Sequence, residues 1–253
     1  MKIASYNVNS VRQRLPNLQA YLEFAKPDVI CLQELKCMED QFPMMEVTAA
    51  GYQAVMVGQK SYNGVTILSK TAASVVQNTI GDEQARYLEV DVGGVRIINI
   101  YAPNGNPLGT EKFTYKLDWL SRLEARMKVL LADEVPFAVL GDYNIIPEAR
   151  DAHNPSAWLG DALYQPESRA MYRRFINLGL TDAFRLYHPD ADAYTFWDYQ
   201  AASWAKNDGI RIDHVLLSPQ LADKCMGCEI DREERGRENP SDHVPIAVTL
   251  KVQ

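Results

Sequence analysis

The 253-residue sequence lacks any apolar stretch that approaches the length of a membrane span, and its first residues lack the long apolar region of a signal peptide. We therefore expect a cytoplasmic protein that has no membrane partner. Cysteine is also scarce. Cys225 and Cys228 have the C-x-x-C spacing of a redox motif or half of a zinc site, but no second close pair accompanies them. Reduced structural thiols are the favoured state of all four cysteines, which are Cys31, Cys37, Cys225 and Cys228.

An excess of positive charge is missing as well, because 26 lysines and arginines stand against 33 acidic residues and the net charge is −7. This balance argues against tight nonspecific binding of nucleic acid. It does not exclude an enzyme that acts on DNA, since a divalent cation would offset several acids and basic residues cluster locally, as Arg12 does with Arg14. The sequence has no repeat and no linker rich in glycine, serine or proline. We therefore expect a single domain over residues 1–253.

Four short apolar runs are each joined to polar residues of the kinds that bind metal ions and phosphate. Residues 29–32 precede Gln33 and Glu34, and residues 137–140 precede the segment 141–144. The polar segments 210–214 and 239–243 lead into the apolar runs 215–217 and 244–248. Runs this short beside turn signals are typical of buried strands, and a sheet brings the ends of distant strands together. We therefore expect one cleft to hold the following residues: Glu34, Asp142, Asn144, Asp213, Asp242 and His243.

Carboxylates, an amide and one imidazole are the groups that a magnesium-dependent site for phosphodiester cleavage needs. One or two protein carboxylates suffice for such a site, because Mg²⁺ prefers oxygen ligands and keeps several waters. The sequence therefore predicts a nuclease.

Apolar periodicity predicts a layered α/β fold. Strands are expected over residues 2–8, 52–57, 65–69, 72–77, 87–92 and 95–101, with a hairpin turn at Gly93-Gly94. Helices are expected over residues 11–25, with an early interruption at Pro16, and over 44–49, 110–131 and 169–178. A long functional loop is expected over residues 146–167. The mixture of hairpins and helices favours a two-layer β-sandwich flanked by helices over a purely parallel, doubly wound sheet.

Six short motifs occur in order along nearly the whole chain. They are Tyr6-Asn7-Val8-Asn9, Leu32-Gln33-Glu34-Leu35-Lys36, Asn99-Ile100-Tyr101-Ala102-Pro103-Asn104, Gly141-Asp142-Tyr143-Asn144, Gly209-Ile210-Arg211-Ile212-Asp213 and Pro240-Ser241-Asp242-His243. Together they resemble the exonuclease III family of apurinic/apyrimidinic endonucleases, within the endonuclease/exonuclease/phosphatase superfamily. The resemblance implies a DNase I-like four-layered α/β sandwich.

The resemblance also indicates a branch of this superfamily. Other members of the superfamily, which include deoxyribonuclease I, sphingomyelinases and inositol-phosphate phosphatases, tend to have histidine where this chain has Tyr101. Tyrosine there is similar to the abasic-site branch. The segment 194–199 is similar to that branch too, which uses an aromatic residue to line a pocket for the flipped-out sugar. The implied activity is Mg²⁺-dependent hydrolysis of double-stranded DNA 5′ of abasic sites, with 3′→5′ exonuclease and 3′-end trimming in an unknown ratio. A 3′-end-specific enzyme and a small-substrate phosphatase are the alternatives.

Roles at the metal are likewise implied by the family pattern. Glu34 is the implied main ligand of Mg²⁺, or of Mn²⁺ as the alternative ion, with Asn7 and Asp242 nearby, directly or through water. Asp142 is expected to orient and deprotonate the attacking water while Asn144 donates to the phosphate, and both side chains would face the same side of an extended backbone. A second metal held by Asp142 and Asn144 is the other interpretation.

The remaining roles concern the phosphate and the DNA. Asp213 is expected to pair with His243 and to favour its charged form, although His243 as general base is an alternative. Tyr101 is expected to hydrogen-bond to the phosphate. The protein is expected to be a monomer. The family pattern places Arg12, Lys36, Tyr62 and Asn104 against the DNA backbone, and Phe196, Ile210 and Ile212 around the abasic sugar.

Overall fold

The computed structural model describes residues 1–252, which form two six-stranded sheets. The first sheet has the strand order β11-β12-β1-β2-β4-β3. Its strands are β1 (Lys2–Asn7), β2 (Val29–Gln33), β3 (Gln53–Val57), β4 (Val65–Ser69), β11 (Cys225–Ile230) and β12 (Ile246–Leu250). The second sheet has the order β5-β6-β7-β8-β10-β9. Its strands are β5 (Ser74–Gln77), β6 (Tyr87–Val92), β7 (Val95–Tyr101), β8 (Phe137–Asp142), β9 (Thr181–Asp182) and β10 (Asp213–Leu217).

The two sheets pack face to face around a core of aliphatic side chains. Ile3 of β1 and Ile67 of β4 meet Ile97 of β7 and Leu140 of β8 in this core, and all four side chains are fully buried. Alternate residues of a strand point to opposite faces, so Ile98 packs on the other side of β7, against the helices. The inner strands β2, β4, β8 and β10 are therefore buried on both faces, whereas the edge strands β3, β5 and β11 are partly exposed.

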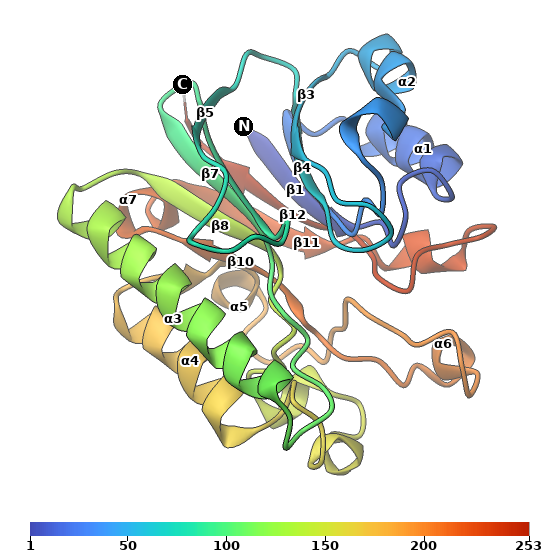
Figure 1. The fold of residues 1–253 in the computed structure, drawn as a ribbon, viewed down its shortest axis with the longest axis vertical. Helices are drawn as coiled ribbons and strands as arrows, with labels where there is room; N and C mark the ends of the chain where they lie inside the picture. The colour runs from blue at the N-terminus through green and yellow to red at the C-terminus, as the bar shows by residue number, and fades with distance from the viewer. Residues whose placement is uncertain (253) are drawn as a thin grey trace.

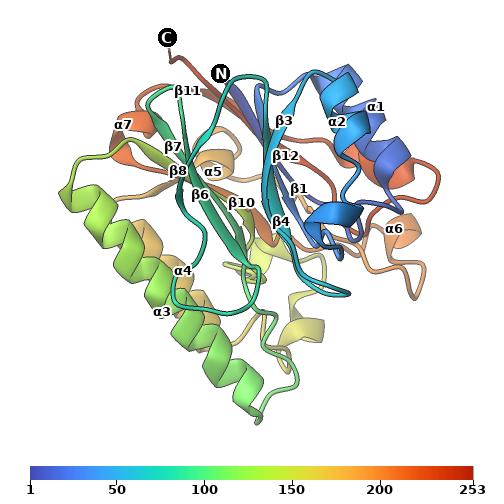
Figure 2. The same ribbon diagram turned by 45° about the horizontal axis from the view of Figure 1, so that its top comes forward.

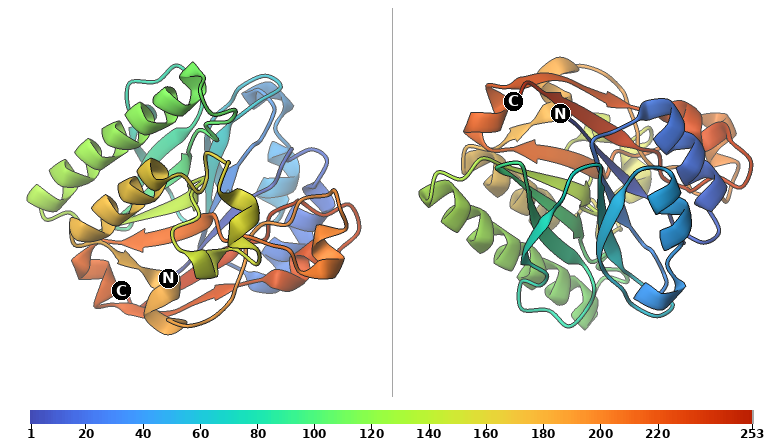
Figure 3. Two further views of the ribbon diagram at one scale, coloured as in Figure 1. Left: turned by 90° about the horizontal axis from the view of Figure 1, so that it is seen from below. Right: turned by 90° about the horizontal axis from the view of Figure 1, so that it is seen from above.

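Helices cover the outer face of each sheet, which gives four layers (Figures 1 and 2). The first sheet carries α1 (Leu15–Ala25) and α2 (Met44–Ala49), and the second carries α3 (Glu111–Ala132) and α4 (Pro166–Asn177). The view from below in Figure 3 shows α3 and α4 side by side. Three short helices complete the chain, namely α5 (Ala183–Tyr187), α6 (Ser203–Lys206) and α7 (Pro219–Ala222). Among residues 1–252 no helix is long and apolar enough to cross a membrane.

Most of the expected elements are confirmed, and β4, β6 and β7 have the expected bounds. The expected helix over residues 11–25 is wrong at its start, because α1 begins at Leu15 and Pro16 lies in its first turn. Proline is tolerated there, since the missing N–H has no helical partner in that turn. The expected loop over residues 146–167 is also partly wrong. It contains the 3₁₀ helices η2 (Ala149–Asp151) and η3 (Pro155–Trp158).

One edge of the sandwich collects the strand ends that carry the polar motifs. β1 and β2 run parallel, so Asn7 pairs with Gln33, and β7 and β8 run parallel, so Tyr101 pairs with Asp142. β10 is antiparallel to β8, which places its first residue, Asp213, opposite Asp142. Topology alone therefore brings residues from both sheets to one place.

His214 follows in β10 and is fully buried. Its Nε2 donates to the carbonyl oxygen of Ile145 at 3.0 Å, and its ring lies against the rings of Tyr143 and Tyr172. Within residues 1–252 no hydrogen-bond partner meets its Nδ1. Burial, together with the positive charge of Arg211, lowers the pKa of His214 to about 4, so the ring is neutral at pH 7.

We expect His214→Phe to cost less stability at acid pH than at neutral pH. The pKa of His214 is about 4 in the native state and about 6.5 in an unfolded chain, so His214 destabilises the native state progressively as the pH falls from 6.5 towards 4. Phenylalanine takes up no proton. The difference in free energy of unfolding between wild type and variant should therefore change by about 2 kcal/mol between pH 7 and pH 5. Urea unfolding at both pH values measures this difference, and a constant difference would contradict the assignment.

Candidate active site

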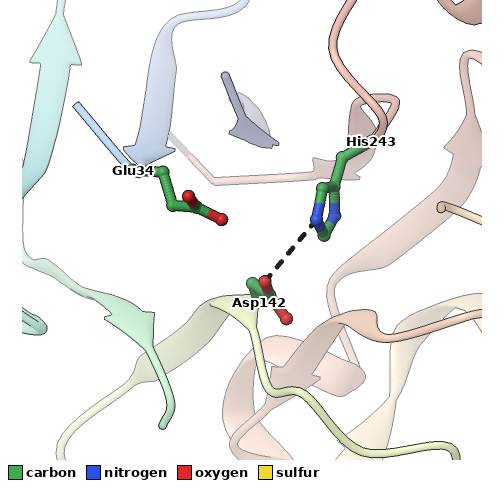
Figure 4. Close-up of side chains that lie close together, drawn as sticks. All are labelled: Glu34, Asp142 and His243. Atoms are coloured by element: carbon green, nitrogen blue, oxygen red, sulfur yellow. Dashed lines mark ion pairs between the residues drawn. The ribbon is translucent and has the colours of Figure 1, made fainter. Parts of the chain in front are cut away.

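Glu34, Asp142 and His243 converge where the strand ends meet. One ligand atom from each of the three lies within 4.8 Å of the other two. Figure 4 shows the three side chains pointing towards one another, with Glu34 just after β2, Asp142 at the end of β8 and His243 on the loop before β12. Nε2 of His243 lies 3.7 Å from Oδ2 of Asp142, which is the interaction marked there. Of the six residues expected in one cleft, five line it, namely Glu34, Asp142, Asn144, Asp242 and His243. The expected place of Asp213 in the cleft is wrong, because its side chain is buried beside His243 and outside the lining.

Unusual backbone conformations set the direction of these side chains. Glu34 follows β2 with φ +55°, and Asn144 follows β8 with φ +49°. Positive φ is uncommon in residues other than glycine and is concentrated at functional sites. Gly141 precedes Asp142 in β8 with φ +146°, and a Cβ atom there would lie 1.9 Å from the carbonyl oxygen of Ile100. Only glycine therefore allows β7 and β8 to approach so closely beside Asp142.

Asn7 and Lys36 hold the Glu34 carboxylate. Nδ2 of Asn7 donates to Oε1 of Glu34 at 2.9 Å and to Oδ2 of Asp142 at 3.1 Å. Nζ of Lys36 lies 3.0 Å from Oε2 of Glu34. Burial would raise the pKa of Glu34, but the Lys36 ammonium and the Asn7 hydrogen bond hold it below its usual range. Oδ1 of Asn7 accepts from the Asn9 backbone N–H, so the amide turns its N–H groups towards the two carboxylates.

His243 lies between two carboxylates. Its Nδ1 lies 2.8 Å from Oδ2 of Asp213, so the expected Asp213–His243 contact is present. Burial would lower the pKa of His243, but Asp213 and then Asp142 outweigh burial and raise it well above its usual value. Burial raises the pKa of Asp142, which the positive His243 opposes and the negative Asp213 reinforces. The pair therefore favours an imidazolium with a proton on each nitrogen.

Asn144 is presented by a turn and not by an extended strand. Its backbone N–H donates to Oδ1 of Asp142 at 2.8 Å, which closes an Asx turn. The expectation that the Asp142 and Asn144 side chains lie on one side of an extended backbone is therefore wrong in its geometry, although both line the same cleft. Nδ2 of Asn144 donates to the carbonyl oxygen of Ala102, and its Oδ1 accepts from Nδ2 of Asn104 at 3.3 Å. One amide N–H of Asn144 remains for a phosphate.

The cleft around these groups has a volume of about 340 Å³. Tyr101 lies in it, with the Arg86 guanidinium 4.8 Å from the centre of its ring. Burial, then the charges of Glu34 and Asp142, raise the pKa of Tyr101, so its phenol stays protonated and can donate. The full lining is Glu34, Tyr101, Asn104, Asp142, Asn144, Trp158, Asp161, Leu163, Phe196, Asp198, Ile212, Asp242 and His243.

The remaining predicted residues lie at different distances from the cleft. Arg12 and Tyr62 are exposed on loops outside its lining. Asp242 lines the cleft but does not belong to the close group of Glu34, Asp142 and His243; its Oδ1 accepts from Nδ2 of Asn9. Phe196 and Ile212 line the cleft as expected.

Ile210 does not line the cleft. Its backbone pairs with Phe196, and its side chain is buried among apolar neighbours that include Ile146 and Ala152. The expected direct contact of Ile210 with the abasic sugar is therefore corrected, because Ile210 lies outside the lining, in the apolar cluster that supports the cleft residues Leu163 and Ile212.

Several residues of the cleft were not predicted. Trp158, Asp161 and Leu163 come from the segment expected as a loop, and Asp198 follows Trp197. An aromatic residue beside aspartates in a long loop was the available signal for this wall. Asn9 also escaped prediction, although it stands in the first motif and its Nδ2 donates to Asp242 at 3.0 Å.

The donor set fits a divalent cation. One carboxylate oxygen of Glu34 and one of Asp142 lie within 4.8 Å of each other. Hard cations prefer carboxylate oxygens as ligands. His243 is less suited as a ligand, because both of its nitrogens face carboxylates and carry protons. The site therefore offers oxygens to the metal and a positive imidazolium beside it.

This combination of a four-layered sandwich and an acid–histidine cleft at its strand ends defines a hydrolase of phosphate esters. The model of the endonuclease/exonuclease/phosphatase family matches residues 4–243, and the chain belongs to this family. It is 35% identical over 267 residues to exodeoxyribonuclease III of Haemophilus influenzae, which covers 99% of this chain and 100% of that relative.

Two solved structures share the fold over their whole length. The 3′ phosphatase NExo from Neisseria, bound to a product DNA hairpin, is 36% identical with a TM-score of 0.96, and the match covers 100% of both chains. An AP endonuclease from Archaeoglobus fulgidus is 34% identical with a TM-score of 0.95, again over 100% of both chains. These similarities confirm the resemblance to the exonuclease III family and the DNase I-like sandwich.

Proposed function

We propose that the protein is a Mg²⁺-dependent DNA-repair hydrolase that cuts double-stranded DNA 5′ of abasic sites and leaves a 3′-hydroxyl and a 5′-deoxyribose phosphate. The observation that carries this proposal is the convergence of Glu34, Asp142 and His243 within 4.8 Å in one cleft. Similarity to an exodeoxyribonuclease III and to an AP endonuclease supports DNA as the substrate. Similarity to NExo from Neisseria, described as a 3′ phosphatase and as a 3′–5′ exonuclease, supports 3′→5′ exonuclease and 3′-end trimming as further activities.

Asp142 is the proposed base that orients and deprotonates the attacking water. Its Oδ1 accepts from the Asn144 backbone and its Oδ2 from Asn7, so the carboxylate is fixed at both oxygens. A base held in one orientation meets its water at a defined position. His243 is a poorer candidate for the base, because its Nδ1 and Nε2 both face carboxylates. A second metal at Asn144 is disfavoured, since its amide oxygen already accepts from Nδ2 of Asn104 at 3.3 Å.

Three donors would stabilise the phosphate. They are the His243 imidazolium, the Tyr101 phenol and the free amide N–H of Asn144, and all three residues line the cleft. Donors already in place cost no rearrangement when negative charge develops in the transition state. Because the three donors line the same cleft as Asp142, they support the binding of a phosphate beside it.

Glu34 is the proposed main metal ligand, with Asn7 and Asp242 nearby, directly or through water. Bound there, Mg²⁺, or Mn²⁺ as the alternative ion, would polarise the scissile phosphate and offset charge on the departing 3′ oxygen. Asn7 and Lys36 would keep the Glu34 carboxylate ionised and oriented before the metal arrives.

The abasic sugar is proposed to bind against the apolar side of the cleft. Phe196 lies edge-on to His243 with ring centres 5.0 Å apart, and Ile212, Leu163 and Trp158 continue this wall. A sugar without a base leaves the stack at low cost, and an apolar wall beside the reacting phosphate would receive it. Arg12, Lys36, Tyr62 and Asn104 are the proposed contacts to the DNA backbone, which fix the register without reading sequence.

We expect Asp213→Asn to lower kcat by about 100-fold, because the neutral amide no longer stabilises the charged imidazolium of His243. Asp213 raises the pKa of His243. In the variant, activity should therefore be lost at lower pH than in wild type as the solution becomes alkaline. A pH–rate profile measures both effects. A profile indistinguishable from that of wild type would remove Asp213 from the mechanism.

Initial rates on three duplexes test the proposed function. One carries a single abasic-site analogue, one has a recessed 3′ end, and one ends in a 3′-phosphate. We expect the fastest reaction on the first, as a single cut whose products carry a 3′-hydroxyl and a 5′-deoxyribose phosphate. Reaction at the 3′ ends without a cut at the lesion would favour the second candidate, a 3′-end-specific exonuclease and phosphatase, for which the similarity to the 3′ phosphatase is the supporting observation. Turnover of a small phosphorylated substrate alone would favour a phosphatase.

We also propose that residues 1–253 form one domain that acts as a cytoplasmic monomer. All four cysteines are free, which suits a reducing compartment. Sedimentation of the protein with and without duplex DNA would test the monomer, and a dimer in both states would contradict it.

A further inference from the structure

Lys116 is buried in an unusual place. It lies on α3 and is fully buried, on a helix whose other contacts with the second sheet are mostly apolar. Its Nζ donates to the carbonyl oxygens of Asn104 at 3.0 Å, Asn144 at 2.5 Å and Ala162 at 3.5 Å. All three acceptors are backbone groups, so the ammonium binds main chain at three points.

These three points belong to three different walls of the cleft. Asn104 follows β7 and Asn144 follows β8, and the side chains of both line the cleft. Ala162 lies between Asp161 and Leu163, which line it as well. The Lys116 side chain therefore connects three segments. They are the turn that presents the phosphate donor Asn144, the loop after β7, and the segment that carries the apolar wall.

The surrounding chain is shaped to this lysine. Gly105 has φ +91°, and a Cβ atom at Gly105 would lie 2.7 Å from Cδ of Lys116. Next to Gly105, Asn106 joins the loop after β7 to the segment around Ala162. Its Oδ1 accepts from the Ala162 backbone N–H at 3.0 Å, and its Nδ2 donates to Asp161 at 3.0 Å. The close approach and the positive φ together favour glycine at position 105.

Burial makes this lysine costly for stability. It lowers the pKa of Lys116 to about 7, against the opposing charges of Asp142 and Asp161. An apolar side chain of similar length would fill the space on α3 with less desolvation. A buried ammonium whose acceptors all lie in cleft segments is better explained by a requirement of the site than by a requirement of the fold.

We propose that Lys116 is a positioning residue for the reaction, which fixes the Asn144 turn and the Asn104 loop relative to Asp142. This inference rests on the proposed function. Lys116 does not touch the substrate in this proposal. It acts by holding the amide of Asn144 where a phosphate would bind, and a displacement of such a donor by about 1 Å lowers turnover by about 100-fold.

Lys116→Met tests the proposal, because methionine keeps the length and removes every N–H donor. On whichever DNA substrate the wild type cleaves, kcat should fall about 100-fold while KM changes less than about threefold. Lys116→Gln retains an amide donor and should give an intermediate kcat. Arg126→Met is the matched control, since Arg126 lies ten residues further along α3, away from the cleft. Its guanidinium donates to the buried Glu89 of β6. It should lower the melting temperature and leave kcat unchanged.

A kcat of Lys116→Met within about twofold of wild type would overturn the proposal. Failure of both Lys116 variants to fold, while Arg126→Met folds, would make the lysine structural and would also overturn it. If the wild type cleaves no phosphodiester, the proposed function fails. NMR then measures whether Lys116 fixes the positions of Asn104 and Asn144. The side-chain amide resonances of Asn104 and Asn144 should then shift in Lys116→Met and stay in place in Arg126→Met, and unmoved resonances in both would contradict the inference.

Discussion

Asp142→Asn is expected to lower kcat by about a thousandfold and to leave DNA binding intact. Asparagine has the same shape and can still accept the Asn144 backbone N–H that now reaches Oδ1 at 2.8 Å, so the turn after β8 should persist. It cannot take a proton from water. Removal of one negative charge beside the phosphate should also leave the affinity for DNA unchanged or tighter. Single-turnover cleavage measures the first effect, and fluorescence anisotropy with labelled duplex in EDTA measures the second.

Asp118→Asn is the control for this change, because Asp118 lies on the exposed face of α3 and outside the cleft. It should behave as wild type in both measurements. A kcat for Asp142→Asn above about a tenth of the wild-type value would exclude Asp142 as the base.

Glu34→Gln should raise the Mg²⁺ concentration that gives half-maximal activity by more than about tenfold and should lower turnover at saturation. The carboxylate of Glu34 lies within 4.8 Å of ligand atoms of Asp142 and His243, and it is the main oxygen donor of the proposed metal site. The amide keeps the size of the side chain but loses the charge that attracts the cation. It also loses the contact with Lys36, whose Nζ lies 3.0 Å from Oε2. Activity titrated with Mg²⁺ measures the shift.

Glu23→Gln on the exposed side of α1 is the matched control, and its Mg²⁺ titration should coincide with that of wild type. An unchanged titration for Glu34→Gln would refute Glu34 as a ligand.

The fold was largely predictable because its strands alternate or run apolar between clear turn signals. β6 and β7 have the expected bounds since Gly93 and Gly94 both adopt positive φ at the hairpin, which glycine does without strain. The short elements α5, α6, α7 and β9 were not predicted. Each has two to five residues, too few for a periodic pattern, and their positions depend on contacts with distant segments.

The site was predictable as far as it depends on strand ends. Glu34, Asp142, Asp213 and His243 stand beside apolar runs, and sheet topology brings such positions together. The local geometry was not predictable. The left-handed turn at Asn144 depends on a hydrogen bond to Asp142, and the sequence alone suggested an extended strand.

Two parts of the site have no local sequence signal. Lys116 reads as a surface lysine on an amphipathic helix, because periodicity does not reveal that three distant carbonyl groups enclose it. Ile210 and Ile212 are identical in chemistry and lie two residues apart in one motif, so the sequence does not distinguish them. Both belong to one apolar cluster in the structure, and only Ile212 reaches the cleft lining.

The central claim is that the Glu34–Asp142–His243 cleft is a metal-dependent phosphodiesterase site that cuts at abasic lesions. The most direct test is incubation of wild-type protein with a duplex that carries one abasic-site analogue, in Mg²⁺ and in EDTA. A single cut 5′ of the analogue in Mg²⁺, absent in EDTA and restored when Mg²⁺ is added back, is the predicted result. A cut that persists in EDTA, or no cut at the analogue in Mg²⁺, would contradict the claim.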